Sequence, residues 1–132
     1  MAAQDKLDQL QAQLGYVFTD VTRLKLALTH RSAAGIHNER LEFLGDAVLE
    51  LVVTHRLYQQ FPGVDEGRLS LFRAQLVRKE SLANKARALS VGRHLILGPG
   101  ERQSGGWERD SILADSLEAI LGAIYLEAGY IL

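Results

Sequence analysis

Apolar residues recur at intervals of three and four along most of the chain, which is the spacing of amphipathic helices. No period-two alternation typical of strands persists, and both prolines lie beside glycines in predicted loops. The pattern predicts an all-α fold. The expected helices cover residues 4–14, 21–31, 38–60, a segment after Asp65 with apolar residues through Val77, 80–90, and a last helix ending at Glu127.

Several helix ends carry residues suited to them. Asp20 and Asp65 are candidate N-caps, because a carboxylate accepts hydrogen bonds from the free N–H groups of a first turn. Either Asp110 or Ser111 is expected to cap the last helix, and Gly129 to end it.

Three carboxylates share one face of the helix predicted over residues 38–60. Glu39, Glu42 and Asp46 lie at i, i+3 and i+7, within an arc of roughly 60°. Apolar side chains cover most of the remaining surface, which predicts a buried helix. Like charges at this spacing repel, and buried carboxylates are costly unless a cation compensates them. The compensating cation, either a basic side chain or a metal ion, therefore decides the chemistry of this face.

A second acidic pair lies on the last predicted helix. Asp115 and Glu118 are at i and i+3 of an otherwise apolar segment. Ala119 and Gly122 lie nearby, and such small residues allow another helix to approach closely. If the two acidic helices pack together, their carboxylates converge on one place.

Two arrangements would compensate such a cluster. A buried salt-bridge network needs arginines on facing helices, and Arg68 or Arg73 could supply them. A divalent metal explains more of the pattern, since oxygen ligands without His or Cys suit Mg²⁺ or Mn²⁺ rather than zinc. An ordinary solvated acidic face is disfavoured because the flanks of both acidic pairs are apolar.

The overall composition limits the classes of protein to which the chain can belong. The chain has 132 residues, 47% of them hydrophobic, and a net charge of −1. This predicts one domain without the basic excess of many nucleic-acid binders, although a local acidic site can offset a basic surface in the sum. The absence of cysteine excludes disulfides and thiol catalysis and fits a reducing cytoplasm. We expect no membrane span and no signal peptide.

Other cofactor chemistry has little support in the sequence. Residues 97–106 match neither a Walker A loop nor a dinucleotide fingerprint, so we expect a flexible surface loop and no organic cofactor. The histidines lack metal-ligand spacing and are expected to be surface or capping residues: His30, His37, His55 and His94.

Four segments resemble, in order, motifs of the bacterial ribonuclease III family. They are ALTHRSA at 27–33, ERLEFLGDAVLEL at 39–51, EGRLSLFRAQLV at 66–77 and ILADSLEAILGAIYLEAG at 112–129. The resemblance implies an all-helical endonuclease domain that cleaves double-stranded RNA with Mg²⁺, for which Mn²⁺ can substitute. It also implies a cytoplasmic homodimer acting in rRNA and other RNA processing, with 5′-phosphate and 3′-hydroxyl products.

The resemblance further implies roles for individual residues. Glu42, Asp46, Asp115 and Glu118 match metal-binding carboxylates, and Asp46 and Glu118 are expected to be the least replaceable. Glu39 and Glu66 match further acidic positions with catalytic or supporting roles. Phe43 matches an aromatic residue that inserts into the partner subunit. Candidate RNA contacts are Arg31, Arg40, Arg73, Arg78, Lys79 and Arg109.

The chain also departs from the family pattern. Bacterial members usually continue into a double-stranded RNA-binding domain, so residues 1–132 are expected to form a catalytic domain without it and without its last helix. A non-catalytic dimerisation or RNA-binding module of the same fold is the main alternative, disfavoured because every expected acid is present. An unrelated helical hydrolase of small phosphoesters is a third possibility.

Overall fold

Helices occupy most of the chain, as the hydrophobic spacing predicts. The computed structural model describes residues 2–33 and 35–130, with side chains from residue 7 onward. Within these ranges there is no strand, and Thr29 and Ile96 form an isolated parallel bridge. The all-α prediction is confirmed. The elements are α1 (Ala2–Leu14), α2 (Val21–Ala27), α3 (Glu39–Gln60), α4 (Glu66–Val77), α5 (Lys79–Ala88), the 3₁₀ turn η1 (Val91–His94), α6 (Pro99–Gln103), the 3₁₀ turn η2 (Gly106–Glu108) and α7 (Asp110–Ala128).

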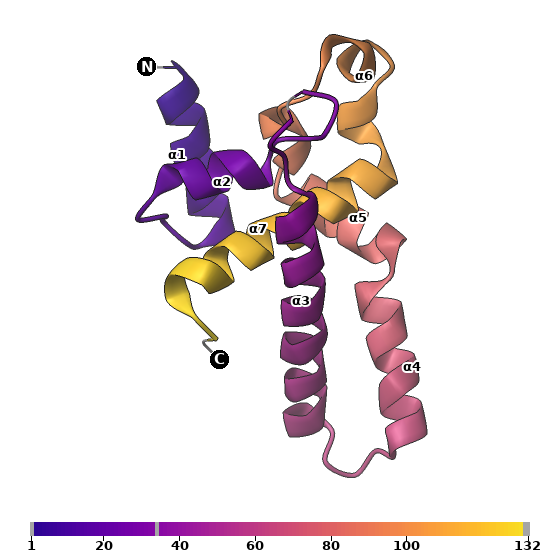
Figure 1. Cartoon of the computed structure of the whole chain (residues 1–132). Coiled ribbons are helices and arrows are strands. Elements are labelled where there is room, and N and C mark those ends of the chain that lie inside the picture. The colour runs from indigo at the N-terminus through magenta and orange to yellow at the C-terminus, as the bar shows by residue number, and fades with distance from the viewer. Residues whose placement is uncertain (1, 34, 131–132) are drawn as a thin grey trace.

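The core is built around α7. This helix crosses α3 and packs against α5 and α2, whereas α3 and α4 form a hairpin that projects away from the rest (Figure 1). Leu113 and Ile120 of α7 are almost fully buried, as are Leu10 and Leu24 of the first two helices. None of the described helices is both long enough and apolar enough to cross a membrane.

The helix α3 is much less buried than its composition predicts. Only Leu41, Gly45 and Leu57 are buried, whereas Phe43 is 83% exposed and Tyr58 is 74% exposed. The prediction of a buried helix is therefore wrong for the single chain. The physical reason is that α7 covers α3 near Gly45 and α4 lies along one other side, so the remaining faces of α3 have no neighbour.

Two glycines allow α3 and α7 to cross with their backbones in contact. A Cβ atom at Gly45 would overlap the carbonyl oxygen of Glu118, and one at Gly122 would overlap the carbonyl oxygen of Leu41. The close approach predicted at Gly122 is thus confirmed, and Gly45 is the matching residue on the other helix. The crossing requires glycine on both sides.

Three of the predicted helix ends are confirmed. The Asp20 carboxylate accepts a hydrogen bond from the backbone N–H of Thr22, and Asp65 accepts one from the backbone N–H of Arg68. Gly129 ends α7 with a φ of 74°, a left-handed value that glycine adopts at little cost. Residues 131 and 132, after which the last helix of the domain is expected to be missing, lie outside the described residues.

The second helix ends earlier than predicted. It stops at Ala27 instead of about Arg31, because the following backbone pairs with a distant segment. The N–H of Ile96 donates to the carbonyl of Leu28 at 2.9 Å, and the N–H of His30 donates to the carbonyl of Ile96 at 2.9 Å. Helical periodicity along one segment carries no information on such a pairing.

The start of α7 and the glycine-rich loop also differ from expectation. Neither Asp110 nor Ser111 is the cap, because both lie inside α7 and Arg109 precedes it without a side-chain cap. The Asp110 carboxylate instead pairs with Arg87 of α5. The loop over residues 97–106 contains the short helix α6, so it is more ordered than predicted.

We predict that Gly45→Ala lowers the free energy of unfolding by about 3 kcal/mol, because the added methyl group would force α3 and α7 apart. Urea denaturation followed by circular dichroism measures this. Gly63→Ala is the matched control, since a Cβ at Gly63 meets nothing within 4 Å. Equal stabilities of the two variants would contradict the close backbone contact.

Candidate metal centre

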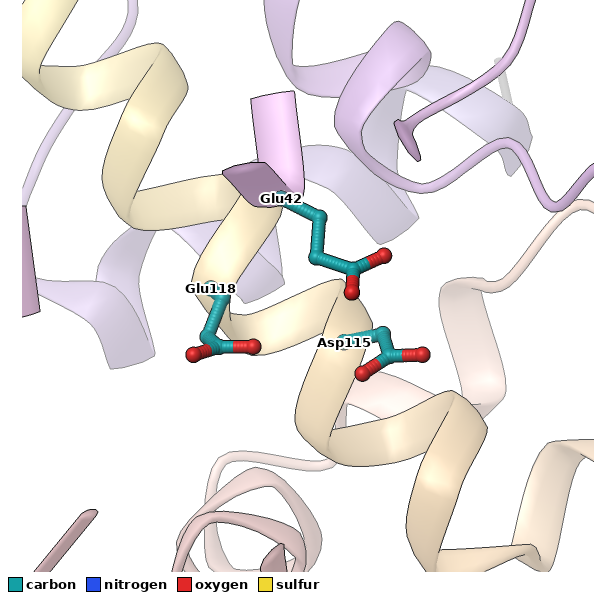
Figure 2. Close-up of side chains that lie close together, drawn as sticks. All are labelled: Glu42, Asp115 and Glu118. Atoms are coloured by element: carbon teal, nitrogen blue, oxygen red, sulfur yellow. The ribbon is translucent and has the colours of Figure 1, made fainter. Parts of the chain in front are cut away.

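The glycine crossing places carboxylates of both helices side by side. One oxygen of each of Glu42, Asp115 and Glu118 lies within 4.8 Å of the others. Figure 2 shows Glu42 reaching from α3 toward the two acids of α7. All three side chains are partly buried. The two acidic faces described from the sequence thus meet in one cluster.

Asp46 extends the cluster on its more exposed side. It shares a hydrogen bond with Glu118, and Glu42 shares one with Asp115. Two carboxyl groups can share a hydrogen bond only if one of them carries a proton. In each pair the neighbouring carboxyl group opposes ionisation, which contributes to the raised pKa of Glu118 and of Glu42.

The pKa values of the cluster are displaced upward. Burial raises the pKa of Glu118 to about 8, and the hydrogen bond with Asp46 and the neighbouring charges act in the same direction. Burial likewise raises the pKa of Glu42 to about 7, with further contributions from Asp115. Burial also raises the pKa of Asp115, opposed by its hydrogen bond with Glu42. Each shift records mainly the cost of burying a negative charge, to which the neighbouring acids add for Glu42 and Glu118.

Basic side chains do not compensate this cost through ion pairs. Arg73, a candidate for a buried network, pairs with Glu50 at 3.3 Å and donates to the hydroxyl of Thr54. Arg31 pairs with Glu39 at 3.6 Å. Within residues 7–33 and 35–130, no lysine or arginine forms an ion pair with any of the four clustered acids. The salt-bridge interpretation is therefore wrong.

The donor set fits a divalent cation. Glu42, Asp115 and Glu118 offer convergent hard oxygen ligands, and Asp46 lies beside them. Such ligands suit Mg²⁺ or Mn²⁺. A cation held there would replace the shared protons and compensate the repulsion. The raised pKa values thus support a site that is completed by a metal.

The cluster opens into a hollow of about 800 Å³ with walls of opposite character. Glu39 and Phe43 lie on the α3 side, and Arg31 and Arg109 line the hollow together with His30. Arg109 pairs with Glu101 at 3.2 Å. The hollow thus combines clustered carboxylates with basic groups suited to a phosphate-bearing ligand.

Glu66 does not join the cluster within this chain. It lies at the start of α4 and lines a separate hollow with Thr54, Tyr58 and Arg73. Its catalytic or supporting role stays a prediction. The other basic residues that were expected to contact RNA also stay predictions. One of them, Arg78, pairs with Glu80 at 3.9 Å.

Sequence patterns did not single out two residues that line the hollow, His30 and Asn38. The buried Asn38 side chain donates to the carbonyl of Ala27 and holds the start of α3 against α2. His30 lies in the matched segment ALTHRSA, but a single histidine has no spacing pattern that distinguishes it. That matched segment was the one available signal.

Comparisons with known proteins define the class. A family model described as Ribonuclease-III-like matches residues 20–131. The chain belongs to the ribonuclease III family. It is 59% identical to Ribonuclease 3 of Aliivibrio fischeri over 92% of its own length and 55% of that protein, and 56% identical to Ribonuclease 3 of Vibrio cholerae over 92% and 54%. The chain therefore spans about half the length of these relatives.

Solved structures agree with this assignment. The nuclease domain of ribonuclease III from Campylobacter jejuni superposes with a TM-score of 0.91 at 48% identity, covering 93% of this chain and 87% of that one. Dicer from Pichia stipitis superposes with a TM-score of 0.65 at 33% identity, covering 84% and 47%. The fold is that of a ribonuclease III nuclease domain.

We predict that the metal-free protein loses stability as the pH rises from about 5 to about 8. Glu42 and Glu118 have an ordinary pKa of 4.5, and in the folded chain their pKa values are about 7 and about 8. The folded state therefore holds more protons in this window, and raising the pH favours unfolding. Thermal unfolding in EDTA across the window measures the effect.

Glu118→Gln should flatten this pH dependence, because the amide does not ionise. Mg²⁺ or Mn²⁺ should raise the melting temperature, most strongly near the upper end of the window, where protons no longer compete for the carboxylates. A metal-free melting temperature that rises between pH 5 and pH 8 would contradict the clustered charges.

Proposed function

We propose that residues 1–132 form the catalytic domain of a Mg²⁺-dependent endoribonuclease that cleaves double-stranded RNA. Its products would carry 5′-phosphate and 3′-hydroxyl ends, and its role would be rRNA and other RNA processing in the cytoplasm. The observation that carries the proposal is the convergence of Glu42, Asp46, Asp115 and Glu118, none of which forms an ion pair with a described lysine or arginine, at the edge of a hollow with arginines in its wall.

In this proposal Glu42, Asp115 and Glu118 hold Mg²⁺, with Asp46 beside them. A bound divalent ion lowers the pKa of water and stabilises charge on a leaving oxygen. Asp46, the more exposed acid, lies on the side from which a substrate would enter. Glu118 and Asp46 are its least replaceable residues, as the resemblance to the family implies.

The basic wall would position the RNA backbone. Arg31 and Arg109 line the same hollow as the acids, and each pairs with a carboxylate, Glu39 or Glu101. Duplex RNA is recognised mainly through its shape, phosphates and 2′-hydroxyls, and exposed arginines can exchange a carboxylate partner for a phosphate. Glu39 would thus act through the orientation of Arg31.

We also propose a homodimer. Phe43 lies next to Glu42 on α3 and is 83% exposed, which leaves a large aromatic side chain in water at the rim of the hollow. Leu51 and Tyr58 on the same helix are 52% and 74% exposed. A second copy of the chain would bury these side chains, and one related structure describes a dimer-forming region in its nuclease domain. Two copies would present one site to each strand of a duplex.

The complete set of acids disfavours a non-catalytic RNA-binding or dimerisation module. Such a module would have no use for carboxylates that destabilise the folded chain. A hydrolase of small phosphoesters would share the metal centre, so its distinguishing feature is the substrate. Turnover of a small phosphoester without cleavage of duplex RNA would favour it.

We expect the purified protein to cleave a long RNA duplex in Mg²⁺ and not in EDTA. Glu118→Gln should lower the rate about 100-fold or more, because a metal ligand contributes several kcal/mol to transition-state stabilisation. Gel analysis of end-labelled RNA measures the cleavage. The folded state should persist in this variant, since the substitution removes a charge that is destabilising without metal.

Asp8→Asn is the matched control, because Asp8 is an exposed residue of α1 and takes no part in the cluster. It should cleave at the rate of the unaltered protein. Normal cleavage by Glu118→Gln in Mg²⁺ would show that the metal centre is assigned incorrectly.

Phe43→Ala should raise the dimer dissociation constant roughly 30-fold or more, since truncating a central aromatic residue of an interface costs about 2 kcal/mol or more. Sedimentation velocity over a dilution series measures the dissociation. Val17→Ala, which alters a residue that is 75% exposed in the segment between α1 and α2, should leave it unchanged. Identical sedimentation of both variants would rule out the proposed role of Phe43.

A further inference from the structure

The segment that carries His30 is fixed to a second segment more than sixty residues away. The backbone of His30 donates to the carbonyl of Ile96 at 2.9 Å, and the N–H of Gly98 donates to the hydroxyl of Ser32 at 2.9 Å. A Cβ at Gly98 would overlap the backbone of Ser32, so the two segments are in direct contact. The backbone position of His30 is therefore defined from both sides.

Hydrogen bonds also define the tautomer of the His30 ring. The backbone N–H of Ser32 donates to Nδ1 at 3.1 Å, and the Ser32 hydroxyl lies 2.8 Å from the same nitrogen. A backbone N–H can only donate, so Nδ1 must be the accepting nitrogen. In the neutral ring the proton is then on Nε2. Both the position and the donor atom of the ring are set before any ligand binds.

The ring lies in the wall of the hollow that contains the acidic cluster. His30 lines this hollow together with Glu42 and Asp115, and it is close enough to Asp115 to lower the pKa of that carboxyl. Among the described residues, no hydrogen bond to Nε2 is observed. The two arginines of the same wall already have carboxylate partners. His30 thus offers a directional donor that no acid has engaged.

We propose that His30 donates a hydrogen bond from Nε2 to a phosphate oxygen of the duplex RNA and thereby positions the strand against the carboxylates. This proposal rests on the proposed function. An N–H donor at this place can bind an anionic phosphate oxygen through a charge-assisted hydrogen bond. Because Nε2 carries the proton, His30 is not a metal ligand, and its loss should leave metal affinity unaltered.

His30→Ala should lower kcat/KM for duplex cleavage about 10- to 100-fold, the range for one hydrogen bond to a charged group. Mn²⁺ affinity measured by calorimetry should not change, and the melting temperature should stay close to that of the unaltered protein. His30→Gln should recover part of the activity, because its amide nitrogen can lie near the position of Nε2. His55→Ala is the matched control, since His55 stacks on Tyr130 away from the hollow.

Two results would overturn the proposal. One is unchanged kcat/KM in His30→Ala; the other is a parallel loss of Mn²⁺ affinity, which would show that His30 only supports the metal centre. If His30→Ala fails to fold, His30→Gln decides, and activity no better than one hundredth of normal in a folded, Mn²⁺-binding His30→Gln protein would count against a donor role.

Duplex binding separates this proposal from the proposed function. Fluorescence anisotropy with Ca²⁺ in place of Mg²⁺ compares the unaltered protein with His30→Ala. If the unaltered protein does not cleave RNA but binds duplex more tightly than His30→Ala, the proposed activity fails and the role of His30 stands. Equal binding by both proteins, or no binding by either, overturns the role of His30.

Discussion

The contact between the backbones of α3 and α7 is the constraint on which the site depends. Gly45 and Gly122 remove the side chains that would keep the two helices apart. At this separation, acids that lie one turn from the glycine contact on one helix come close to those on the other helix. Glu42 and Asp46 flank Gly45, and Asp115 and Glu118 precede Gly122, so the same crossing that builds the core also assembles the carboxylates. Fold and chemistry therefore cannot be altered independently at this point.

The crossing has an electrostatic cost, which the chain does not remove. Arginines that would neutralise the acids are engaged elsewhere, with Arg73 on Glu50 and Arg31 on Glu39. Burial and the neighbouring acids therefore raise the pKa values of Glu42 and Glu118. A built-in salt bridge would stabilise the fold but would occupy the oxygens that a metal needs. The unfavourable charge is thus a requirement of an open metal site.

Local patterns predicted most of the fold. The helical spacing, the caps at Asp20 and Asp65, and the stop at Gly129 are properties of short segments, and the sequence contains them directly. The acids of the cluster were also identifiable, because charge on an otherwise apolar helix is unusual wherever the helix packs.

Long-range pairing was not predictable in the same way. The early end of α2 depends on Ile96, and the start of α7 depends on Arg87. The tautomer of His30 depends on Ser32, only two residues away, yet the geometry that makes Ser32 a donor is imposed in part by Gly98. The burial of α3 failed as a prediction for a different reason. The composition of a helix indicates that its apolar side chains will be buried. It does not show whether the same chain or another molecule buries them.

The uncovered face of α3 carries an aromatic residue beside an acid of the cluster. Phe43 and Glu42 are neighbours in sequence, so one turn of helix presents an aromatic side chain and a carboxylate of the candidate metal site to the same hollow. Neither is satisfied within the single chain: the first lacks an apolar neighbour and the second lacks a cation. A partner that covered Phe43 would also exclude water from the rim beside Glu42, and a lower local dielectric strengthens the attraction between carboxylate and metal. Association and metal binding at this helix would then reinforce one another, which explains physically why a nuclease of this fold would carry both on one turn.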